Sequence, residues 1–259
     1  MSATPVLAAD TLTVARGPRT VLHGVGFDIH HGERVAIIGP NGAGKTTLLL
    51  TLLGILHPQS GAVRLNGVDL QRIRPRRRIA THMAYVPQHY DGFMGFTVYD
   101  MVAAARYAQS SVIGLHSSTD RAVVESALAT CEIEDLATRL VSQLSAGQRQ
   151  MVWIAAAVAQ ESPFLLLDEP TTALDPRHHT DVLTLLDRLA GDGRTLIFVS
   201  HDLNIAVSLD ARVLALRDGR LVMDDHVTRV VQPEPLHRIF DTTFDLPERP
   251  AGGRWAIPG

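Results

Sequence analysis

The chain has 259 residues, of which 46% are hydrophobic and 20% are charged, and its formal net charge is −3. This composition is close to the average of soluble globular proteins, and the length allows one large α/β domain or a core with an inserted lobe. The slightly acidic balance argues against a protein that binds nucleic acid through bulk charge.

Cysteine content and hydropathy indicate a cytoplasmic protein. Cys131 is the single cysteine of the chain, so no intrachain disulfide can form, and a lone thiol suits a reducing compartment. The N-terminus has no basic leader followed by an apolar core, so we expect no signal peptide. The most apolar stretches, 48–56 and 151–159, are shorter than the ~20 residues that a membrane-spanning helix needs. Any membrane role is therefore expected to come through a partner.

The first third of the chain is predicted to be rich in β-structure. Apolar residues alternate with polar or small ones over 12–14 and 25–29, as in half-buried strands. The apolar run 34–38 predicts a buried strand, which leads through a glycine-rich loop into a helical pattern over 45–54. Further signals are a hairpin turn at Asn66-Gly67 and a strand over 82–86.

The rest of the chain predicts an inserted helical lobe and then a return to the sheet. Residues from about 97 to 160 show a helical pattern without a convincing strand. Buried strands follow at 164–167 and 195–199, each with a helical segment behind it, which is typical of a doubly wound α/β fold. Asp218-Gly219 predicts a late hairpin, and the sequence from about Pro233 is Pro-rich and weakly patterned.

A phosphate-binding loop is predicted at 39–46, where GPNGAGKT fits the pattern G-x-x-x-x-G-K-[ST]. Lys45 supplies a compact positive charge for phosphates, and Thr46 offers a hydroxyl to Mg²⁺. An ordinary glycine-rich turn with a surface lysine is the alternative, but the flanking strand and helix favour phosphate binding. The expected ATP-binding residues are Gly39, Pro40, Asn41, Gly42, Ala43, Gly44, Lys45, Thr46 and Thr47.

Two adjacent carboxylates end the apolar run 164–167. Because open α/β sheets present ligands at the carboxyl ends of their strands, Asp168 is expected to hold Mg²⁺. Glu169 is expected to accept a proton from the water that attacks the γ-phosphate. In isolation the pair could equally form a solvated helix cap, but the phosphate loop elsewhere in the chain favours the catalytic interpretation.

Residues 144–148 read LSAGQ, and this segment resembles the LSGGQ signature of the ABC ATPase family. Ser145 is a natural N-cap for the following helix, and Gly147 allows close approach. In the family the signature contacts the γ-phosphate held by the opposite subunit, so Ser145, Gly147 and Gln148 are expected to bind nucleotide in a head-to-tail dimer. Ala146 replaces the first glycine of the family pattern and leaves the backbone donor in place.

Further family elements follow in the expected order. Gln88 matches the Q-loop glutamine that contacts Mg²⁺ and the water, and Asp175 matches the D-loop, which crosses the dimer interface. His201 matches the switch histidine that touches the γ-phosphate. The resemblance thus implies Glu169, His201 and Gln88 as catalytic residues, and Thr46, Gln88 and Asp168 as Mg²⁺ ligands.

The fold implied by the resemblance is a P-loop ABC ATPase core with a parallel sheet, an N-terminal antiparallel β subdomain and an inserted helical subdomain. The ABC ATPase domain is expected over 4–240, with the helical subdomain at 89–162 and a C-terminal tail at 241–259.

The segment 201–206, HDLNIA, makes the chain look like the ATPases of importers for ferric siderophores, haem and cobalamin. This implies coupling of ATP hydrolysis to uptake of an iron(III)-siderophore, with cobalamin or haem as the alternatives. Implied partners are a second copy of the chain, a transmembrane permease and, indirectly, an extracytoplasmic substrate-binding protein, but no nucleic acid. The chain is then expected at the cytoplasmic face of the membrane.

Two rival functions remain. A soluble ABC ATPase acting on DNA or ribosomes generally carries two cassettes or a long coiled coil, and this chain shows no sustained heptads. A small P-loop kinase has no use for a signature segment.

The remaining histidines lack a carboxylate or cysteine cluster at ligand spacing. A basic cluster comprises Arg72, Arg74, Arg76, Arg77 and Arg78. We favour a solvated surface for this cluster, and a contact with a permease or the membrane is the alternative.

Arg16 occupies the place where the family usually has an aromatic residue that stacks on adenine. A guanidinium plane can also stack on a base. We therefore expect Arg16→Ala to weaken nucleotide affinity roughly tenfold, measured by titration with a fluorescent ATP analogue. An unchanged dissociation constant would rule out this role.

Overall fold

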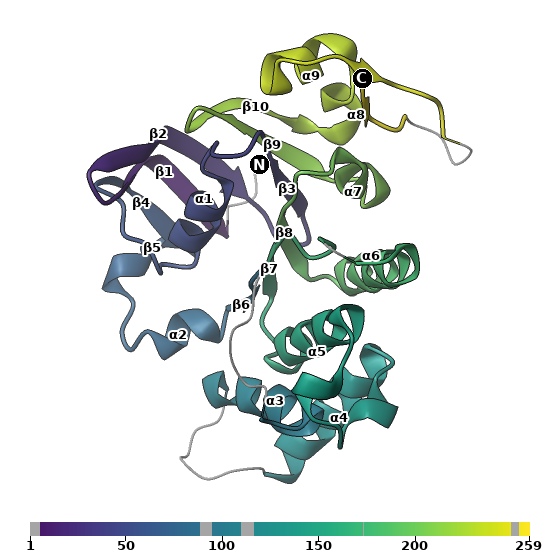
Figure 1. The fold of residues 1–259 in the computed structure, drawn as a ribbon. Helices are drawn as coiled ribbons and strands as arrows, with labels where there is room; N and C mark the ends of the chain where they lie inside the picture. The colour runs from purple at the N-terminus through teal and green to yellow at the C-terminus, as the bar shows by residue number, and fades with distance from the viewer. Residues whose placement is uncertain (1–5, 89–94, 110–116, 173, 250–253) are drawn as a thin grey trace. The chain divides into compact units, whose positions relative to one another are not determined.

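The computed structural model describes residues 6–88, 95–109, 117–172, 174–249 and 254–259, and the chain divides into two compact units. Unit 1 comprises the segments Met1–Ile73 and Ala190–Gly259, and unit 2 the segment Arg74–Leu189. Figure 1 shows both, coloured along the chain. The predicted domain limits at residues 4 and 89 lie outside the described residues, because 1–5 and 89–94 are not among them.

Unit 1 contains an antiparallel sheet in the order β2-β1-β4-β5. The first two strands are longer than predicted, since they continue to a tight hairpin in which Arg16 lies opposite Arg19. Leu65 pairs with Val68 across Asn66-Gly67, which confirms the predicted hairpin. The strands are β1 (Leu7–Arg16), β2 (Arg19–Ile29), β4 (Ser60–Leu65) and β5 (Val68–Asp69).

The second sheet of unit 1 has the strand order β10-β9-β3-β8, in which β3 pairs in parallel with both β8 and β9. Strand β10 pairs antiparallel with β9 and confirms the hairpin predicted at Asp218-Gly219. These strands are β3 (Arg34–Ile38), β8 (Thr195–Val199), β9 (Arg212–Arg217) and β10 (Arg220–His226). All five side chains of β8 and the last four of β3 are buried, as expected for a parallel sheet.

Helix α1 (Lys45–Leu52) contacts β1, β2 and β8, so it lies between the two sheets of unit 1 (Figure 1). The segment from Pro233 differs from the weak pattern of its sequence. It forms a helix whose fixed proline φ suits a first helical position, and Leu236 and Ile239 are buried. The other short elements of the unit are η1 (Leu70–Arg72), α7 (Leu203–Ser208), α8 (Val227–Val230), α9 (Pro233–Phe240), β11 (Phe244–Asp245) and β12 (Ile257–Pro258).

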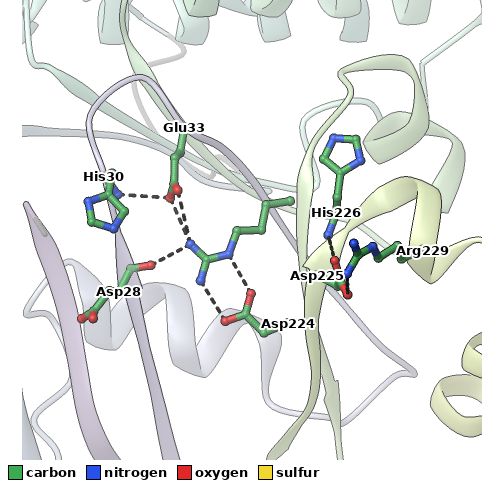
Figure 2. Close-up of polar contacts among 8 residues, drawn as sticks. Asp28, His30, Glu33, Asp224, Asp225, His226 and Arg229 are labelled. Atoms are coloured by element: carbon green, nitrogen blue, oxygen red, sulfur yellow. Dashed lines mark hydrogen bonds and ion pairs between the residues drawn. The ribbon is translucent and has the colours of Figure 1, made fainter. Parts of the chain in front are cut away.

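A charge network fastens the sheet of β3 and β9 to the end of β2. Arg212 donates from Nε and Nη2 to the two carboxylate oxygens of Asp224, at 2.7 and 2.8 Å, and from Nη1 to Glu33 at 3.2 Å and to the carbonyl of Asp28 at 2.8 Å. Figure 2 shows Asp224, Glu33 and Asp28 around this guanidinium. Hydrogen bonding to Asp224 raises the pKa of Arg212 above its ordinary value. The bidentate pair holds β9 to its hairpin partner β10, and the contacts from Nη1 join β9 to residues 28 and 33, which are far from it in the sequence.

Unit 2 combines a parallel strand pair with a helical cluster. Strand β6 (Met83–Val86) pairs with β7 (Phe164–Asp168), and every side chain of β7 is buried. Helices α3, α4 and α5 contact one another (Figure 1), and for the described residues these helices confirm the helical character predicted from about residue 97 to 160. The helical elements are α2 (Arg77–Ala80), α3 (Val98–Ala104), η2 (Ala105–Ala108), α4 (Ser118–Thr130), η3 (Glu134–Leu136), η4 (Val141–Gln143), α5 (Ala146–Ala159) and α6 (Pro176–Gly191). Within the described residues, none of the helices is both long and apolar enough to cross a membrane.

A buried ion pair links the helices of unit 2. Arg106 is 8% exposed and donates to Asp120 at 2.9 Å, to Glu161 at 2.6 Å and to the carbonyl of Ala159 at 2.7 Å. Hydrogen bonds from Arg106 and then Ser117 lower the pKa of Asp120. Because the guanidinium reaches α4 and the end of α5 together, this pair fixes their spacing.

We expect this pair to make the stability of the protein depend on pH. Asp120→Asn should lower the free energy of unfolding by about 2 kcal/mol at neutral pH, because it removes a buried charge partner of Arg106. A lowered pKa of Asp120 stabilises the folded state only while the carboxyl group is ionised. The difference in unfolding free energy between the unaltered chain and Asp120→Asn should therefore be complete above pH 3.8, the ordinary pKa of an aspartate, and should shrink as the pH falls below it. Denaturant unfolding over a pH series measures this.

Glu125→Gln is the matched control, since Glu125 is an exposed carboxylate on the same helix. A loss caused by Asp120→Asn that stays constant from neutral pH to about pH 3 would contradict the assignment.

Candidate functional site

The glycine-rich loop of unit 1 connects β3 to α1, as predicted. Gly39 has a φ of 146°, and a Cβ at this position would lie 2.0 Å from the carbonyl oxygen of Leu216 in β9. Only glycine fits, because the loop passes directly against the backbone of the neighbouring strand. The sheet therefore dictates where the loop begins.

Lys45 turns its ammonium group back into this loop. Lys45 is the first residue of α1 and is 8% exposed. Its Nζ donates to the carbonyls of Gly39 at 2.8 Å and Pro40 at 3.1 Å. Gly44, which precedes the helix with a φ of 100°, brings no side chain to the helix N-terminus. A buried ammonium beside the positive end of a helix dipole is suited to an anion such as a phosphate group.

The other loop residues have graded exposure. Asn41 and Gly42 are exposed, Thr46 is half-buried, and Ala43 and Thr47 are buried. This places the rim of the loop at the surface, while the helix behind it packs into the core.

His201 leaves the sheet at the same edge as this loop. Ile37 of β3 lies opposite Val199 of β8, and the N–H of Ser200 donates to the carbonyl of Ile37 at 3.2 Å. Asp202 then caps α7, and its own N–H donates to Oγ of Ser200 at 2.9 Å. His201 is exposed between these two fixed residues. Parallel register thus explains why positions so distant in sequence serve one edge.

Arg16 lies at the exposed tip of the β1–β2 hairpin. Further along β2, Leu22 borders the loop: a Cβ added to Gly44 would lie 2.7 Å from its Cδ2. The strand that follows the Arg16 hairpin therefore lines the phosphate loop, and the adenine-stacking role of Arg16 stays a prediction.

Asp168 ends the buried strand β7 in unit 2 and is 2% exposed. Burial, and secondly the charge of Asp168, raise the pKa of Tyr85 on the adjacent strand to about 12. An ionised carboxylate at a strand end is the type of ligand that Mg²⁺ prefers, so Asp168 fits a metal ligand.

Glu169 adopts a left-handed backbone, with a φ of 54°. For a residue other than glycine this conformation costs about 1 kcal/mol, and such strain is concentrated at functional sites. The hydroxyl of Thr172 donates to Oε2 of Glu169 at 2.8 Å, and its N–H donates to the Glu169 carbonyl at 3.2 Å. Thr172 thus fixes the carboxylate, a role that the sequence pattern did not reveal because it depends on the turn.

The signature segment begins α5 as predicted. Oγ of Ser145 accepts the N–H of Gln148 at 3.2 Å, and the Gln148 side chain accepts the N–H of Ser145 at 3.1 Å. This reciprocal capping box confirms Ser145 as the N-cap. It also occupies the Gln148 side chain, which was predicted only as a nucleotide contact.

Asp175 and Gln88 lie in unit 2. Oδ1 of Asp175 accepts the N–H groups of Arg177 and His178, both at 3.0 Å, and so caps the start of α6. The backbone hydrogen bond of His178 is the largest cause of the lowered pKa of Asp175. Gln88 is exposed just after β6. Ala173, the first residue of the predicted D-loop, lies outside the described residues.

All five arginines of the basic cluster are exposed. Arg77 nevertheless packs, since its Nε donates to the carbonyl of Ala108 at 3.1 Å and its guanidinium lies 5.8 Å from the centre of the Tyr107 ring. Within the described part of the chain, no three His, Cys, Asp or Glu side chains are grouped to hold a metal ion.

Comparisons with known proteins agree with this arrangement. A family model described as ABC transporter matches residues 22–172. The iron(3+)-hydroxamate import ATP-binding protein FhuC of Bacillus subtilis (strain 168) is 36% identical over 241 residues, which cover 93% of this chain and 89% of the relative. The ferric enterobactin transport ATP-binding protein FepC of Escherichia coli (strain K12) is 36% identical over 248 residues, which cover 95% and 91%.

Solved structures give the same picture. A metal-chelate type ABC transporter in an inward-facing conformation has a TM-score of 0.85 at 28% identity, covering 98% of this chain and 97% of the other. A dimeric ATP-binding cassette with bound ADP and Pi has a TM-score of 0.75 at 28% identity, covering 85% of this chain and 98% of the other.

The contact between Thr172 and Glu169 generates a prediction. Thr172→Val removes the hydroxyl that holds the Glu169 carboxylate but keeps the side-chain shape. We expect kcat for ATP hydrolysis to fall roughly fivefold while KM for ATP stays the same, because a misplaced base affects the chemical step. Steady-state assays of phosphate release measure both constants.

Thr180→Val is the control, because its exposed hydroxyl donates only within α6, to the Pro176 carbonyl at 3.0 Å. Equal effects of the two substitutions, or a change confined to KM, would show that Thr172 does not position the base.

Proposed function

The chain belongs to the ABC transporter family, and on this premise we propose that it is the ATP-binding and ATP-hydrolysing subunit of an importer for iron(III)-siderophores. The observation that carries the ATPase part is the Lys45 ammonium, buried inside a glycine loop at a helix N-terminus. The names of the iron-siderophore import relatives support the importer part.

Nucleotide binding is assigned to the loop 39–47. Its backbone, the start of α1 and the Lys45 charge, which the Gly39 and Pro40 carbonyls hold inside the loop, bind the phosphates of ATP. Arg16 stacks on the base. Ser145, Gly147, Gln148 and Asp175 of one copy complete the site of a second copy.

Hydrolysis needs a base and an electrostatic clamp rather than a covalent nucleophile. The carboxylate of Glu169 accepts a proton from water as the water oxygen attacks the γ-phosphorus, and the bond from phosphorus to the bridging oxygen of ADP breaks. His201 contacts the γ-phosphate, and Gln88 orients the water. Thr172 keeps the Glu169 carboxylate in position.

Mg²⁺ is the cofactor that this chemistry requires. Thr46, Gln88 and Asp168 would hold it, and the carboxylate of Asp168, buried at the end of β7, fits that role. When bound, the ion neutralises charge on the phosphates.

The proposed assembly is a head-to-tail pair of these chains on a transmembrane permease, at the cytoplasmic face of the membrane. The dimeric solved neighbours support the pair, and the import names of the relatives support the permease. ATP binding closes the pair, and hydrolysis reopens it. An extracytoplasmic binding protein delivers the cargo, so the chain itself binds neither siderophore nor nucleic acid.

Haem is the second candidate cargo, with cobalamin as a further alternative. The hemin import ATP-binding protein HmuV of Nitrobacter winogradskyi is 32% identical over 262 residues, which cover 98% of this chain and 95% of the relative. Because the cargo contacts other subunits, uptake by whole cells must decide between these substrates.

The decisive experiment measures uptake of radiolabelled ferric siderophore, haem and cobalamin in cells that carry Glu169→Gln instead of the unaltered chain. We expect loss of ferric siderophore uptake, because the variant binds ATP but lacks the base, with kcat lowered by at least about a hundredfold. Thr180→Val serves as the control.

Loss of haem or cobalamin uptake alone would replace the proposed cargo. Normal uptake of all three, together with abolished hydrolysis by the purified variant, would remove the importer function and leave an ATPase that acts elsewhere.

A further inference from the structure

Gly147, in the first turn of α5, packs against the ring of His178. A Cβ added to Gly147 would lie 2.4 Å from both Cγ and Cδ2 of His178 and 2.9 Å from its Cβ. These separations are shorter than any carbon–carbon contact in a packed interior. The histidine ring therefore occupies the space that a side chain at position 147 would need.

The other side of the same ring is fixed by Asp175. Nδ1 of His178 lies 2.7 Å from Oδ2 of this carboxylate. An ionised carboxylate can only accept, so Nδ1 carries the proton and donates. Oδ1 of Asp175 accepts the N–H groups of Arg177 and His178 at 3.0 Å each, so both oxygens of the carboxylate bind the start of α6. The His178 ring is therefore held in place by Asp175 and does not move as a free surface side chain would.

Through these two contacts the His178 ring links the start of α5 to the start of α6. On one side lies the signature segment 144–148, and on the other lies Asp175, the cap of α6. Both contacts are specific. The ring fills the space that a side chain at Gly147 would take, and its contact with Asp175 is a charge-assisted hydrogen bond. A shift of either helix start must therefore move the ring or be resisted by it.

The ring lies beside open space. His178 lines a cavity of about 650 Å³ in unit 2, together with Gln148, Met151 and Asp181. A side chain at position 147 could push the ring into this space, and the hydrogen bond to Asp175 would then break. Substitution of Gly147 is therefore expected to disconnect the two segments without unfolding the protein.

We propose that His178 is a positioning residue that holds the signature segment 144–148 and the D-loop carboxylate of Asp175 in register. The inference rests on the proposed function, in which both segments complete the ATP site of a second copy. Glycine at position 147 is then required within its own chain, because the His178 ring occupies the space of a side chain there. Approach to the nucleotide of a second copy is not its only role. The sequence pattern around 178 gives no sign of this role, because it depends on contacts with a separate helix.

The test is a double-substitution cycle on the full-length chain. Gly147→Ala, His178→Ala and the double variant are compared with the unaltered chain for kcat, KM for ATP and ATP-induced dimerisation, the last in a Glu169→Gln background. His178→Asn is included because its amide can donate to Asp175 from the place of Nδ1. Gly191→Ala is the matched control, since a Cβ there meets no atom within 4 Å.

We expect Gly147→Ala and His178→Ala each to lower kcat roughly tenfold, with KM for ATP unchanged. In the His178→Ala background, the further effect of Gly147→Ala should be less than about twofold, because the obstructing ring is gone. His178→Asn should recover most of the lost rate, and ATP-induced dimerisation should weaken in step with kcat. Gly191→Ala should behave as the unaltered chain.

Three results would overturn the proposal. Equal losses from Gly147→Ala with and without His178 would show that the glycine is needed only for another contact. A normal rate in His178→Ala, beside an active unaltered chain and an inactive Glu169→Gln variant, would refute the positioning role while the proposed function stands. An unaltered chain that does not hydrolyse ATP would overturn the proposed function, and this inference with it.

Discussion

The parallel pairing of β3 with β8 and β9 is the constraint on which the rest of unit 1 depends. Side chains of these strands are buried on both faces, so the strands can offer polar groups to a ligand only where they end. The register that sets Ile37 opposite Val199 brings the glycine loop and His201 to one edge. In unit 2 the same rule places Asp168 and Glu169 directly after the buried strand β7. The glycine loop, His201 and the two carboxylates therefore all lie at strand ends.

Two of these ends carry unusual backbone, and each has a local cause. At Gly39 the chain turns against the carbonyl of Leu216, which leaves no room for a side chain. At Glu169 a left-handed residue directs the carboxylate, and Thr172 then holds it. Because strained turns of this kind cost stability, they persist only where the buried strands before them are firmly packed. Firm packing of β3 and β7 thus makes the proposed catalysis possible.

The proposed importer function assigns cargo binding to other subunits. An ATPase subunit that meets its cargo only through other subunits needs a phosphate site and contact surfaces, and no cargo pocket. The structural features that distinguish this chain accordingly concern how its own segments are held together. The Arg106–Asp120 pair spaces the helices of unit 2, and the His178 ring joins the starts of α5 and α6.

Motifs whose residues are contiguous were predictable from the sequence. The phosphate loop, the two carboxylates, the capping serine Ser145 and both hairpin turns depend on local geometry and on buried runs of four to five residues. Both signals can be read directly from the sequence. Helix α9 escaped prediction because it is short, begins with a proline and buries few side chains.

Only the tertiary structure decided which distant residues touch. The C-terminal segment returns to α7, where Ala256 and Asn204 exchange hydrogen bonds of 2.9 and 3.2 Å, although the sequence indicated only a tail. In the same way, Thr172 supports Glu169, and His178 fills the space beside Gly147. The sequence by itself determined the class of chemistry, because binding phosphate requires a fixed local pattern of glycine, lysine and helix. How firmly that chemistry is positioned was decided by the fold, because contacts between separate segments depend on packing that no local pattern encodes.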